Sequence, residues 1–237
     1  MGPDVDRTSG STRPPRRDED DVSTSIFEAD SALLRFLSKV ADVMVLNLVF
    51  VLTSLPIVTI GASLTALNYT ALRIVDGECE SVLDCYRRSF RQNLRQATVL
   101  FGIVVGLAVV LVAWFLIADG LAIASIVRFA LYIVLFLVTF QAVIGALFVF
   151  PYLAKFEGST REVLGNARKM SLRHLFASLA FLLTTGLPVV ITIFYPHLVG
   201  YGLLWLAFGF AAIAVVNAFL FSAIFAKYVP TAPEGVA

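Results

Sequence analysis

Residues 175–226 read LFASLAFLLTTGLPVVITIFYPHLVGYGLLWLAFGFAAIAVVNAFLFSAIFA and contain no Asp, Glu, Lys or Arg. A membrane-spanning helix needs about 20 apolar residues to cross roughly 30 Å of hydrocarbon. The stretch is therefore long enough for two spans, and the Pro- and Gly-containing residues around 195–202 form the turn between them. We expect membrane segments at 175–195 and 203–226.

The composition of the whole chain is also typical of a membrane protein. Of its 237 residues, 59% are hydrophobic and 15% are charged, whereas a soluble domain is roughly 45–50% apolar and about 25% charged. Two further uncharged stretches, 97–118 and 129–150, each have the length of one span. We therefore expect an all-α fold, a polytopic transmembrane helix bundle.

The first apolar stretch, residues 40–72, is ambiguous. It contains one charged residue, Asp42, and is interrupted by Pro56 and Gly61. Proline removes a helix donor and disfavours helix at the residue before it, so the helix is expected to break there. Two interpretations remain open. The two halves form a short hairpin, which gives six membrane segments, or one kinked and tilted helix crosses alone, which gives five.

Positive charge lies in two blocks. They are Arg73, Arg87, Arg88, Arg91 and Arg95, and Lys155, Arg161, Arg168, Lys169 and Arg173. The positive-inside rule places both blocks in the cytoplasm. A hairpin then keeps Arg35 and Lys39 inside as well, whereas a single first span would put them outside. We favour the hairpin, with both termini cytoplasmic and segments at 40–56, 58–74, 97–118, 129–150, 175–195 and 203–226.

Two amphipathic helices are expected between these segments, at about 81–96 and 160–174. The first has an apolar stripe and an adjoining basic one, formed by Val82, Tyr86, Phe90 and Leu94 and by Arg87, Arg91 and Arg95. The second starts with a capping box, Ser159 to Glu162, and carries Arg168, Lys169 and Arg173. Such helices lie in the headgroup layer and contact anionic lipid. A contact surface for a protein partner is the alternative.

Polar residues inside membrane segments are candidates for function because they are costly to bury. The candidates are Asp42, Asn47, Thr59, Gly61 and Asn68. Simpler structural roles compete with function. Asp42 can form an ion pair at a helix end, and Asn47 can hydrogen-bond between helices, as can Gln141 and Asn217. Thr59 and Gly61 can satisfy backbone groups that Pro56 leaves free.

Two local patterns suggest helix packing and symmetry. Gly102 and Gly106 form a small-xxx-small motif, which predicts close helix contact within the bundle or between copies. Residues 50–58 and 181–190 share an apolar helix, two hydroxyl residues and Leu-Pro. A true repeat of this kind, with broken helices at corresponding positions, would indicate a transporter site.

The chain divides into a tail, a membrane domain and a second tail. Residues 1–30 hold eight acidic and four basic residues and little that could be buried, so a disordered cytosolic tail is expected. No secretory signal is recognised there. Residues 31–228 form the transmembrane domain, and 229–237 form a short C-terminal tail.

No catalytic signature is recognised. The two histidines, His174 and His197, have no metal-ligand spacing, and no nucleotide-binding loop or nucleophile elbow is present. Cys79 and Cys85 are expected to be free, reduced thiols. We expect no enzyme activity, catalytic residue, cofactor or metal. Because topology explains the basic residues, nucleic acid is not an expected partner.

Several motifs resemble one known family. They are Asp42, LNL at 46–48, LPIVTIGAS at 55–63, ALNY at 66–69 and DCYRRSFRQNLRQAT at 84–98. These residues resemble the YesL-like family of bacterial integral membrane proteins of unknown function. The resemblance covers about residues 30–110, and beyond that it rests on hydropathy alone. The family typically has an aromatic pair where this chain has Cys85 and Tyr86.

The resemblance implies a bacterial inner-membrane protein. Because members often lie beside genes for carbohydrate uptake and degradation, it implies by analogy an accessory role in sugar transport. Membrane lipids and an ABC-type sugar importer, or another membrane protein, are then the expected partners. A small transporter or channel with its site near Pro56 is the alternative, and a membrane-embedded enzyme is a third hypothesis.

Overall fold

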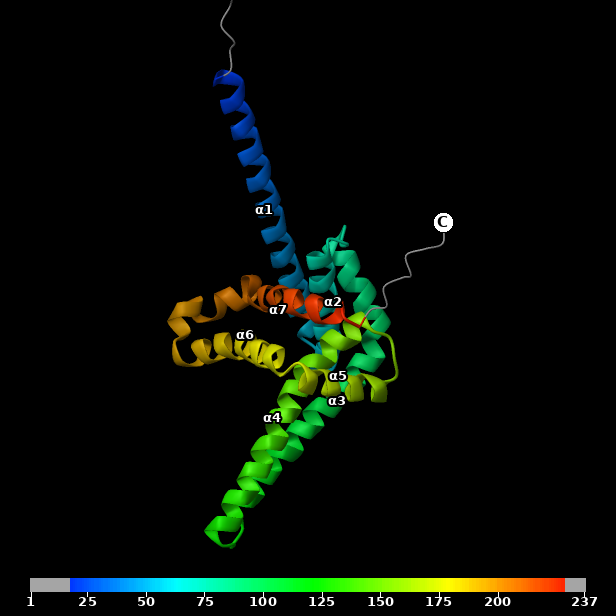
Figure 1. Cartoon of the computed structure of the whole chain (residues 1–237), viewed down its shortest axis with the longest axis vertical. Coiled ribbons are helices and arrows are strands. Elements are labelled where there is room, and N and C mark those ends of the chain that lie inside the picture. The colour runs from blue at the N-terminus through cyan, green and yellow to red at the C-terminus, as the bar shows by residue number, and fades with distance from the viewer. Residues whose placement is uncertain (1–17, 229–237) are drawn as a thin grey trace, which may run out of the picture. The chain divides into compact units, whose positions relative to one another are not determined.

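The computed structural model describes residues 18–228. Within that range all regular elements are helical (Figure 1): α1 (Asp18–Ser54), η1 (Ile57–Thr59), α2 (Ile60–Asp76), α3 (Val82–Gly120), α4 (Ser125–Lys155), α5 (Thr160–Arg173), α6 (Leu175–Phe194), η2 (Pro196–Gly202), η3 (Trp205–Gly209) and α7 (Phe210–Phe225). Six helices in the described part are long and apolar enough to cross a membrane. The predicted all-α polytopic bundle is therefore confirmed.

The chain separates into two units, residues 1–41 and 42–237, and α1 runs across the boundary. This helix begins at Asp18, so residues 18–30 are helical where the sequence predicted a disordered tail. Residues 1–17 and 229–237 lie outside the described residues, and the three-part division of the chain stays a prediction.

The first apolar stretch forms two separate helices. Helix α1 ends at Ser54, and α2 begins at Ile60 after the short turn η1. Pro56 is extended, with φ −74° and ψ 117°. The Ser63 hydroxyl lies 3.1 Å from the Thr53 hydroxyl, although residues ten apart in one straight helix are about 15 Å apart. The chain therefore turns back at Pro56, as the hairpin interpretation requires.

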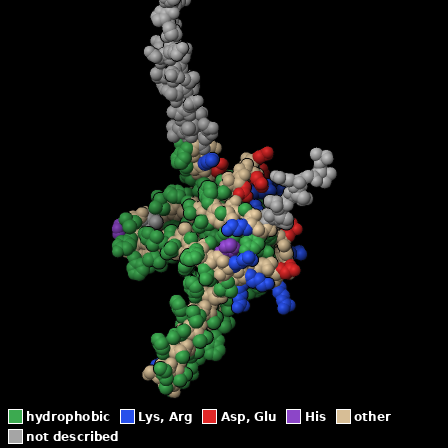
Figure 2. All heavy atoms as spheres, in the orientation of Figure 1, with side chains coloured by type: hydrophobic (Ala, Val, Ile, Leu, Met, Phe, Trp, Pro, Cys, Tyr) green, Lys and Arg blue, Asp and Glu red, His purple; other side chains and the backbone are tan. Residues whose placement is uncertain are grey.

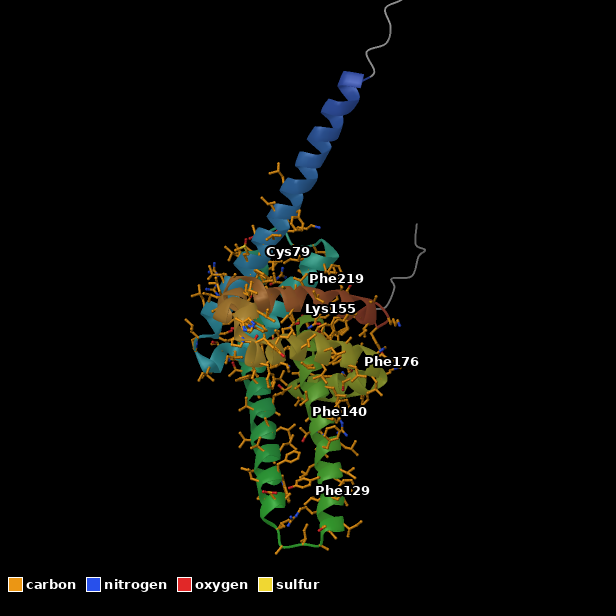
Figure 3. All side chains as sticks on the ribbon, turned by 90° about the vertical axis from the view of Figure 1, so that its left-hand side faces the viewer. Cys79, Phe129, Phe140, Lys155, Phe176 and Phe219 are labelled. Atoms are coloured by element: carbon orange, nitrogen blue, oxygen red, sulfur yellow. The ribbon has the colours of Figure 1, made fainter. Side chains whose placement is uncertain are left out.

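Helix α3 corrects one sequence expectation. The amphipathic helix at 81–96 and the span at 97–118 are one continuous helix, Val82–Gly120. The change from basic to apolar sequence at residue 97 involves no Pro or Gly, so polarity changes there while the helix continues. Helix α4 likewise extends beyond the expected 129–150 at both ends. Figures 1 and 3 show α3 and α4 side by side.

The core of residues 42–228 surrounds α2, which packs against α3, α4 and α7. Helices α6 and α7 form a second pair, joined by η2 and by the π-helical η3, and both views show this pair lying across the direction of α3 and α4 (Figures 1 and 3). Rings of Phe148, Phe181 and Phe221 join α4, α6 and α7, with centroids 3.9 to 5.3 Å apart. The crossing of the two pairs is therefore held by aromatic packing.

The closest helix contact involves Gly61. A Cβ built on this residue would lie 2.3 Å from the Ala97 carbonyl oxygen and 2.7 Å from Cβ of Phe101. Only a residue without a side chain allows α2 to approach the α3 backbone so closely. Gly61 thus has a clear packing role at the start of α2.

The similarity between residues 50–58 and 181–190 does not produce similar local structures. Pro56 follows the end of α1, whereas Pro188 lies inside α6, which continues to Phe194. The chain therefore does not carry two helices broken at corresponding positions.

Candidate functional site

The hydroxyl groups around the Pro56 break hydrogen-bond to one another. The Thr53 hydroxyl donates to the Val49 carbonyl at 2.8 Å and lies 2.5 Å from the hydroxyl of the buried Tyr86. Ser63 donates to Thr53, and Thr59 donates to the carbonyls of Thr53 and Pro56 at 2.6 and 2.7 Å. Most polar groups here therefore have partners inside the protein, which favours a structural role for Thr59.

Asn47 joins α1 to the start of α7. Its side chain is fully buried. The amide nitrogen donates to the carbonyls of Trp205 and Leu206 at 2.9 and 2.8 Å, and the amide oxygen accepts from the Ala211 N–H at 3.0 Å. These backbone groups lie in and just after the π-helical turn, where the regular α-helical pairing is interrupted. Asn47 restores the missing partners.

Two other amides, the buried Asn217 and the half-buried Gln141, also link helices. Asn217 of α7 accepts from the Thr184 hydroxyl and donates to the Thr185 hydroxyl at 3.4 Å. Gln141 of α4 donates to Ser171 of α5 at 3.3 Å. Both arrangements match the interhelical hydrogen bonds expected from the sequence.

Asp42 and Asn68 are half-buried, and neither takes part in the hydrogen bonds that the described residues form around the Pro56 break. The Asn68 amide donates to the Leu64 carbonyl of its own helix at 2.8 Å. Asn68 lines the cavity described below, whereas Asp42, Asn47, Thr59 and Gly61 do not. The structure thus separates the candidates that the sequence grouped together.

A cavity of about 660 Å³ lies where the two helix pairs cross. Its wall comes from α1, α2, α3, α4, α6, η3 and α7, and it is mostly aliphatic and aromatic. Four uncharged polar residues, Asn68, Thr185, Thr192 and Asn217, belong to the wall, and no charged residue does. Ligand pockets of this size typically have such an apolar lining with a few polar groups.

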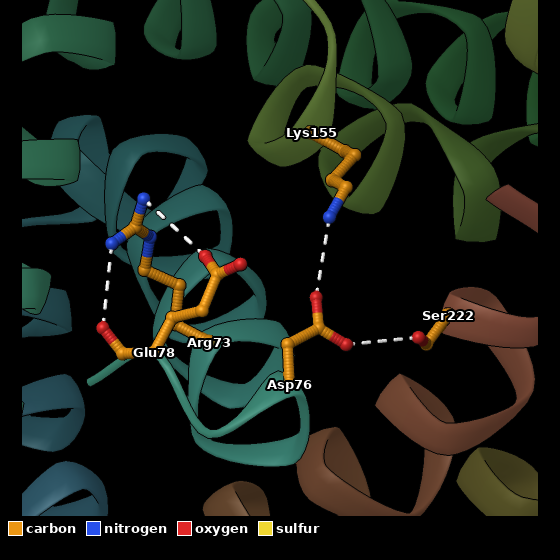
Figure 4. A network of polar contacts seen from close by, with 5 residues as sticks. All are labelled: Arg73, Asp76, Glu78, Lys155 and Ser222. Carbon is orange, nitrogen blue, oxygen red and sulfur yellow. Dashed lines mark hydrogen bonds and ion pairs between the residues drawn. The ribbon is translucent and has the colours of Figure 1, made fainter. Parts of the chain in front are cut away.

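A polar network that the sequence did not indicate joins three helix ends (Figure 4). The Asp76 carboxylate at the end of α2 lies 3.2 Å from Nζ of Lys155 at the end of α4, and it accepts a 2.9 Å hydrogen bond from Ser222 of α7. Arg73 pairs with Glu78 at 3.6 Å. In the sequence, the only sign of this network was that Asp76 lies beside the basic residue Arg73. Residue spacing could not identify Lys155 and Ser222 as the partners of Asp76.

The two basic stripes lie on exposed helix faces. Arg87, Arg91 and Arg95 of α3 are exposed, as are Arg168, Lys169 and Arg173 of α5. The Gln96 amide donates to the Gly158 carbonyl at 2.7 Å, which links α3 to the turn before α5. Figure 2 shows blue side chains gathered over this part of the molecule, while hydrophobic ones cover the α3–α4 pair and the α6–α7 pair. We call Arg87, Arg91 and Arg95 of α3, together with Arg168, Lys169 and Arg173 of α5, the basic surface.

The basic surface has little internal charge compensation. Within the described residues the ion pairs are Arg73 with Glu78 and Lys155 with Asp76, and neither involves one of its six cations. The opposite faces of the two helices are buried. They carry Val82 and Tyr86 in α3, and Val163 and Met170 in α5. The amphipathic pattern predicted for both helices is therefore present, and the capping box at Ser159 is formed in full.

Gly102 and Gly106 lie on an exposed face of α3. A Cβ at either position would meet nothing within 4 Å among the described atoms. The described chain therefore places no helix against this motif, and the expected contact within the bundle is not seen. Contact between copies stays a prediction.

Cys79 and Cys85 are free thiols. Burial raises the pKa of Cys79 to about 12, and the hydrogen bond and charge of Cys85 add to this effect. His174, between α5 and α6, lies 2.9 Å from the Tyr228 hydroxyl. Burial lowers its pKa, and the positive charges of Lys227 and Arg173 lower it further. The partly buried surroundings of Cys79 and His174 favour a structural role for these side chains.

Comparison with known proteins gives one match. The model of a family described as proteins of unknown function, DUF624, matches residues 43–115. The matched segment holds the end of α1, all of α2 and most of α3, and so includes the Pro56 break and the first basic stripe. No match to the chain is found among curated proteins or among solved structures.

Proposed function

We propose that this chain is a non-enzymatic bacterial inner-membrane protein of the YesL-like family that acts as an accessory component of a carbohydrate uptake system. Its basic surface faces the cytoplasm and binds an acidic surface on the membrane subunits of an ABC-type sugar importer. The six exposed cations on α3 and α5, none of them in an ion pair within the described residues, carry this proposal.

The core contacts of α3 and α5 are made by the buried apolar residues on the opposite faces of these helices, and of the six cations only Arg173 lies over an aromatic ring within the described residues, that of Tyr228 at 5.9 Å. A cluster of one sign raises the local concentration of an oppositely charged partner and sets its orientation. Anionic lipid headgroups compete for the same surface, as expected for basic helices beside a membrane.

Transport of sugar by this chain alone is less well supported. A sugar needs many hydrogen-bond partners, and burying its hydroxyl groups without them is costly. The cavity wall is mainly apolar. At the Pro56 break, the hydroxyls of Thr53, Thr59 and Ser63 are already paired with protein groups. The accessory role therefore fits the residues better than a sugar pathway.

Co-purification with an importer tests the proposal. The triple change Arg87→Gln, Arg91→Gln and Arg95→Gln should reduce recovery of the importer's membrane subunits at least fivefold. The matched triple change to Lys keeps the charge and should retain most of the binding. Retention of the importer by the Gln variant would contradict the proposal.

Topology must be checked in the same samples, because removing positive charge can change insertion. A cysteine at Ser23, in a chain with Cys79 and Cys85 replaced by Ala, should stay unlabelled by an impermeant thiol reagent outside intact cells. Labelling from outside would contradict the cytoplasmic N-terminus. Purified chain in liposomes should also release no trapped oligosaccharide, and flux would favour the transporter hypothesis.

A further inference from the structure

We propose that the cavity between α2, α4, α6 and α7 binds the apolar chain of a neutral membrane lipid that carries a hydroxyl group. The cavity of about 660 Å³ is much larger than the engineered apolar cavities of about 150 Å³ that stay dry and bind benzene. A space of this size and lining gains free energy when an apolar molecule replaces water or empty volume.

The surroundings of the cavity determine which molecules reach it. The helices that form it are long and apolar enough to span a membrane, and large apolar side chains cover their outer surfaces. In a bilayer the molecules around such helices are lipids, so long hydrocarbon chains are the most abundant candidates. Sugars and ions would have to leave water to enter.

The polar atoms in the cavity wall determine which headgroup of a lipid can bind there. No charged residue lines the cavity, so an ionised headgroup inside would have no counter-charge and would be strongly disfavoured. Asn68 donates to Leu64 and its amide oxygen makes no hydrogen bond within the described residues. The Thr185 hydroxyl accepts from Asn217, and its proton has no acceptor there. The Asn68 oxygen and the Thr185 proton are thus available to a ligand, as is the second N–H of the Asn68 amide and of the Asn217 amide.

A hydroxyl group can donate to the Asn68 oxygen or accept from Thr185. An alkane can satisfy neither, and a carboxylate or phosphate would need a positive partner. Trp205 also lines the cavity, and its indole N–H is already used, donating to Thr192 at 2.7 Å. The polar wall therefore favours an uncharged alcohol at the end of a long apolar chain.

Photolabelling tests this proposal with the full chain in phosphatidylcholine vesicles. The probe is hexadecanol with a diazirine in the middle of its chain, and the matched probes are a diazirine hexadecane and a diazirine palmitate. Peptide mapping should place the alcohol label on lining residues such as Phe181 and Trp205. Exposed residues such as Phe176 and Phe219, labelled in Figure 3, report ordinary lipid contact.

Two variants make the test specific. Ala146→Phe fills the cavity from α4 and should reduce labelling of the lining residues at least fivefold. Ala130→Phe, on an exposed position of the same helix outside the lining, should leave it unchanged. Thr185→Val keeps the shape but removes the hydroxyl, and should weaken alcohol labelling about three- to tenfold without changing hexadecane labelling.

The outcomes separate clearly. Labelling that follows exposure, with Phe176 as strong as Phe181, overturns the proposal, as does equal labelling by alcohol and palmitate. If Ala146→Phe does not fold, the Thr185→Val comparison decides, and equal alcohol labelling in that variant overturns the proposal. Competition by unlabelled diacylglycerol or by a polyprenol then distinguishes the two lipid sources of such a hydroxyl.

Discussion

Lys155 at the end of α4 lies 3.2 Å from the carboxylate of Asp76 at the end of α2. The other oxygen of that carboxylate accepts a hydrogen bond from Ser222 of α7 at 2.9 Å. One acidic side chain therefore joins three helices at a common end. The two ion-pair side chains are 35% and 21% exposed, so solvent screens part of their attraction.

Replacing Asp76 by Asn should destabilise the protein modestly. The change removes the ion pair but keeps a polar group for Ser222, so we expect a loss of about 1 kcal/mol in the free energy of unfolding. Thermal unfolding in detergent, with Lys155→Gln and the double variant, measures the coupling. Glu78→Gln breaks the longer and more exposed Arg73 pair and should cost less. Additive effects of the two single changes would contradict a direct interaction.

The contact at Gly61 gives a sharper prediction. Gly61→Ala places a methyl group 2.3 Å from the Ala97 carbonyl oxygen, so α2 and α3 must separate. Overpacking of this kind typically costs about 1–3 kcal/mol, measured as a lower unfolding temperature.

Gly102→Ala is the matched control for that change. Nothing lies within 4 Å of its Cβ position, and Ala is about 1 kcal/mol better than Gly inside a helix. We therefore expect unchanged or slightly higher stability. Strong destabilisation by Gly102→Ala would instead mean that the exposed face of α3 packs against another molecule, such as a second copy.

Acid should loosen the start of α5. The Ser159 backbone N–H and hydroxyl donate to the Glu162 carboxylate at 2.7 and 2.9 Å, and these bonds lower the pKa of Glu162 below its ordinary value of 4.5. The folded state thus binds this proton more weakly than the unfolded state. The stabilisation is complete above pH 4.5 and is lost as the pH falls through the lowered pKa.

Hydrogen exchange at the first-turn amides of α5 measures this effect. Protection should decrease between pH 5 and pH 3, after correction for intrinsic exchange, in the wild type. Glu162→Gln removes the titrating carboxylate, which Ser159→Ala would leave bonded to the backbone N–H of residue 159, and should give protection with little pH dependence. Equal pH dependence in the two proteins would show that another group is responsible.

The sequence predicted the features that depend on local chemistry. Pro56 fixes its own φ and removes a donor, so the break between α1 and α2 was predictable. The capping box at Ser159 and the apolar stripe through Tyr86 depend on spacings of three and four residues, which a helix brings to one side. Hydropathy indicated the last four spans, and the choice of six rather than five also needed the Pro56 break and the distribution of positive charge.

Contacts between distant residues were not predictable. Asp76 meets partners 79 and 146 positions away, and Asn47 meets carbonyls 158 and 159 positions away. The fusion of 81–96 with 97–118 was missed because a change in polarity marks a change of surroundings, not the end of a helix. The cavity depends on how the two helix pairs cross, which no local pattern encodes.

We therefore expect replacement of Asn47 to lower the free energy of unfolding more than replacement of any other polar residue discussed above. Asn47→Leu keeps a similar volume but leaves the Trp205 and Leu206 carbonyls and the Ala211 N–H without their side-chain partner. Each buried polar group without a partner costs about 1–3 kcal/mol, so we expect a loss of about 2–5 kcal/mol in the free energy of unfolding. Asn68→Leu is the control, because that half-buried amide donates only within its own helix. Equal losses in the two variants, measured by thermal unfolding in the same detergent, would mean that the π-helical turn does not depend on Asn47.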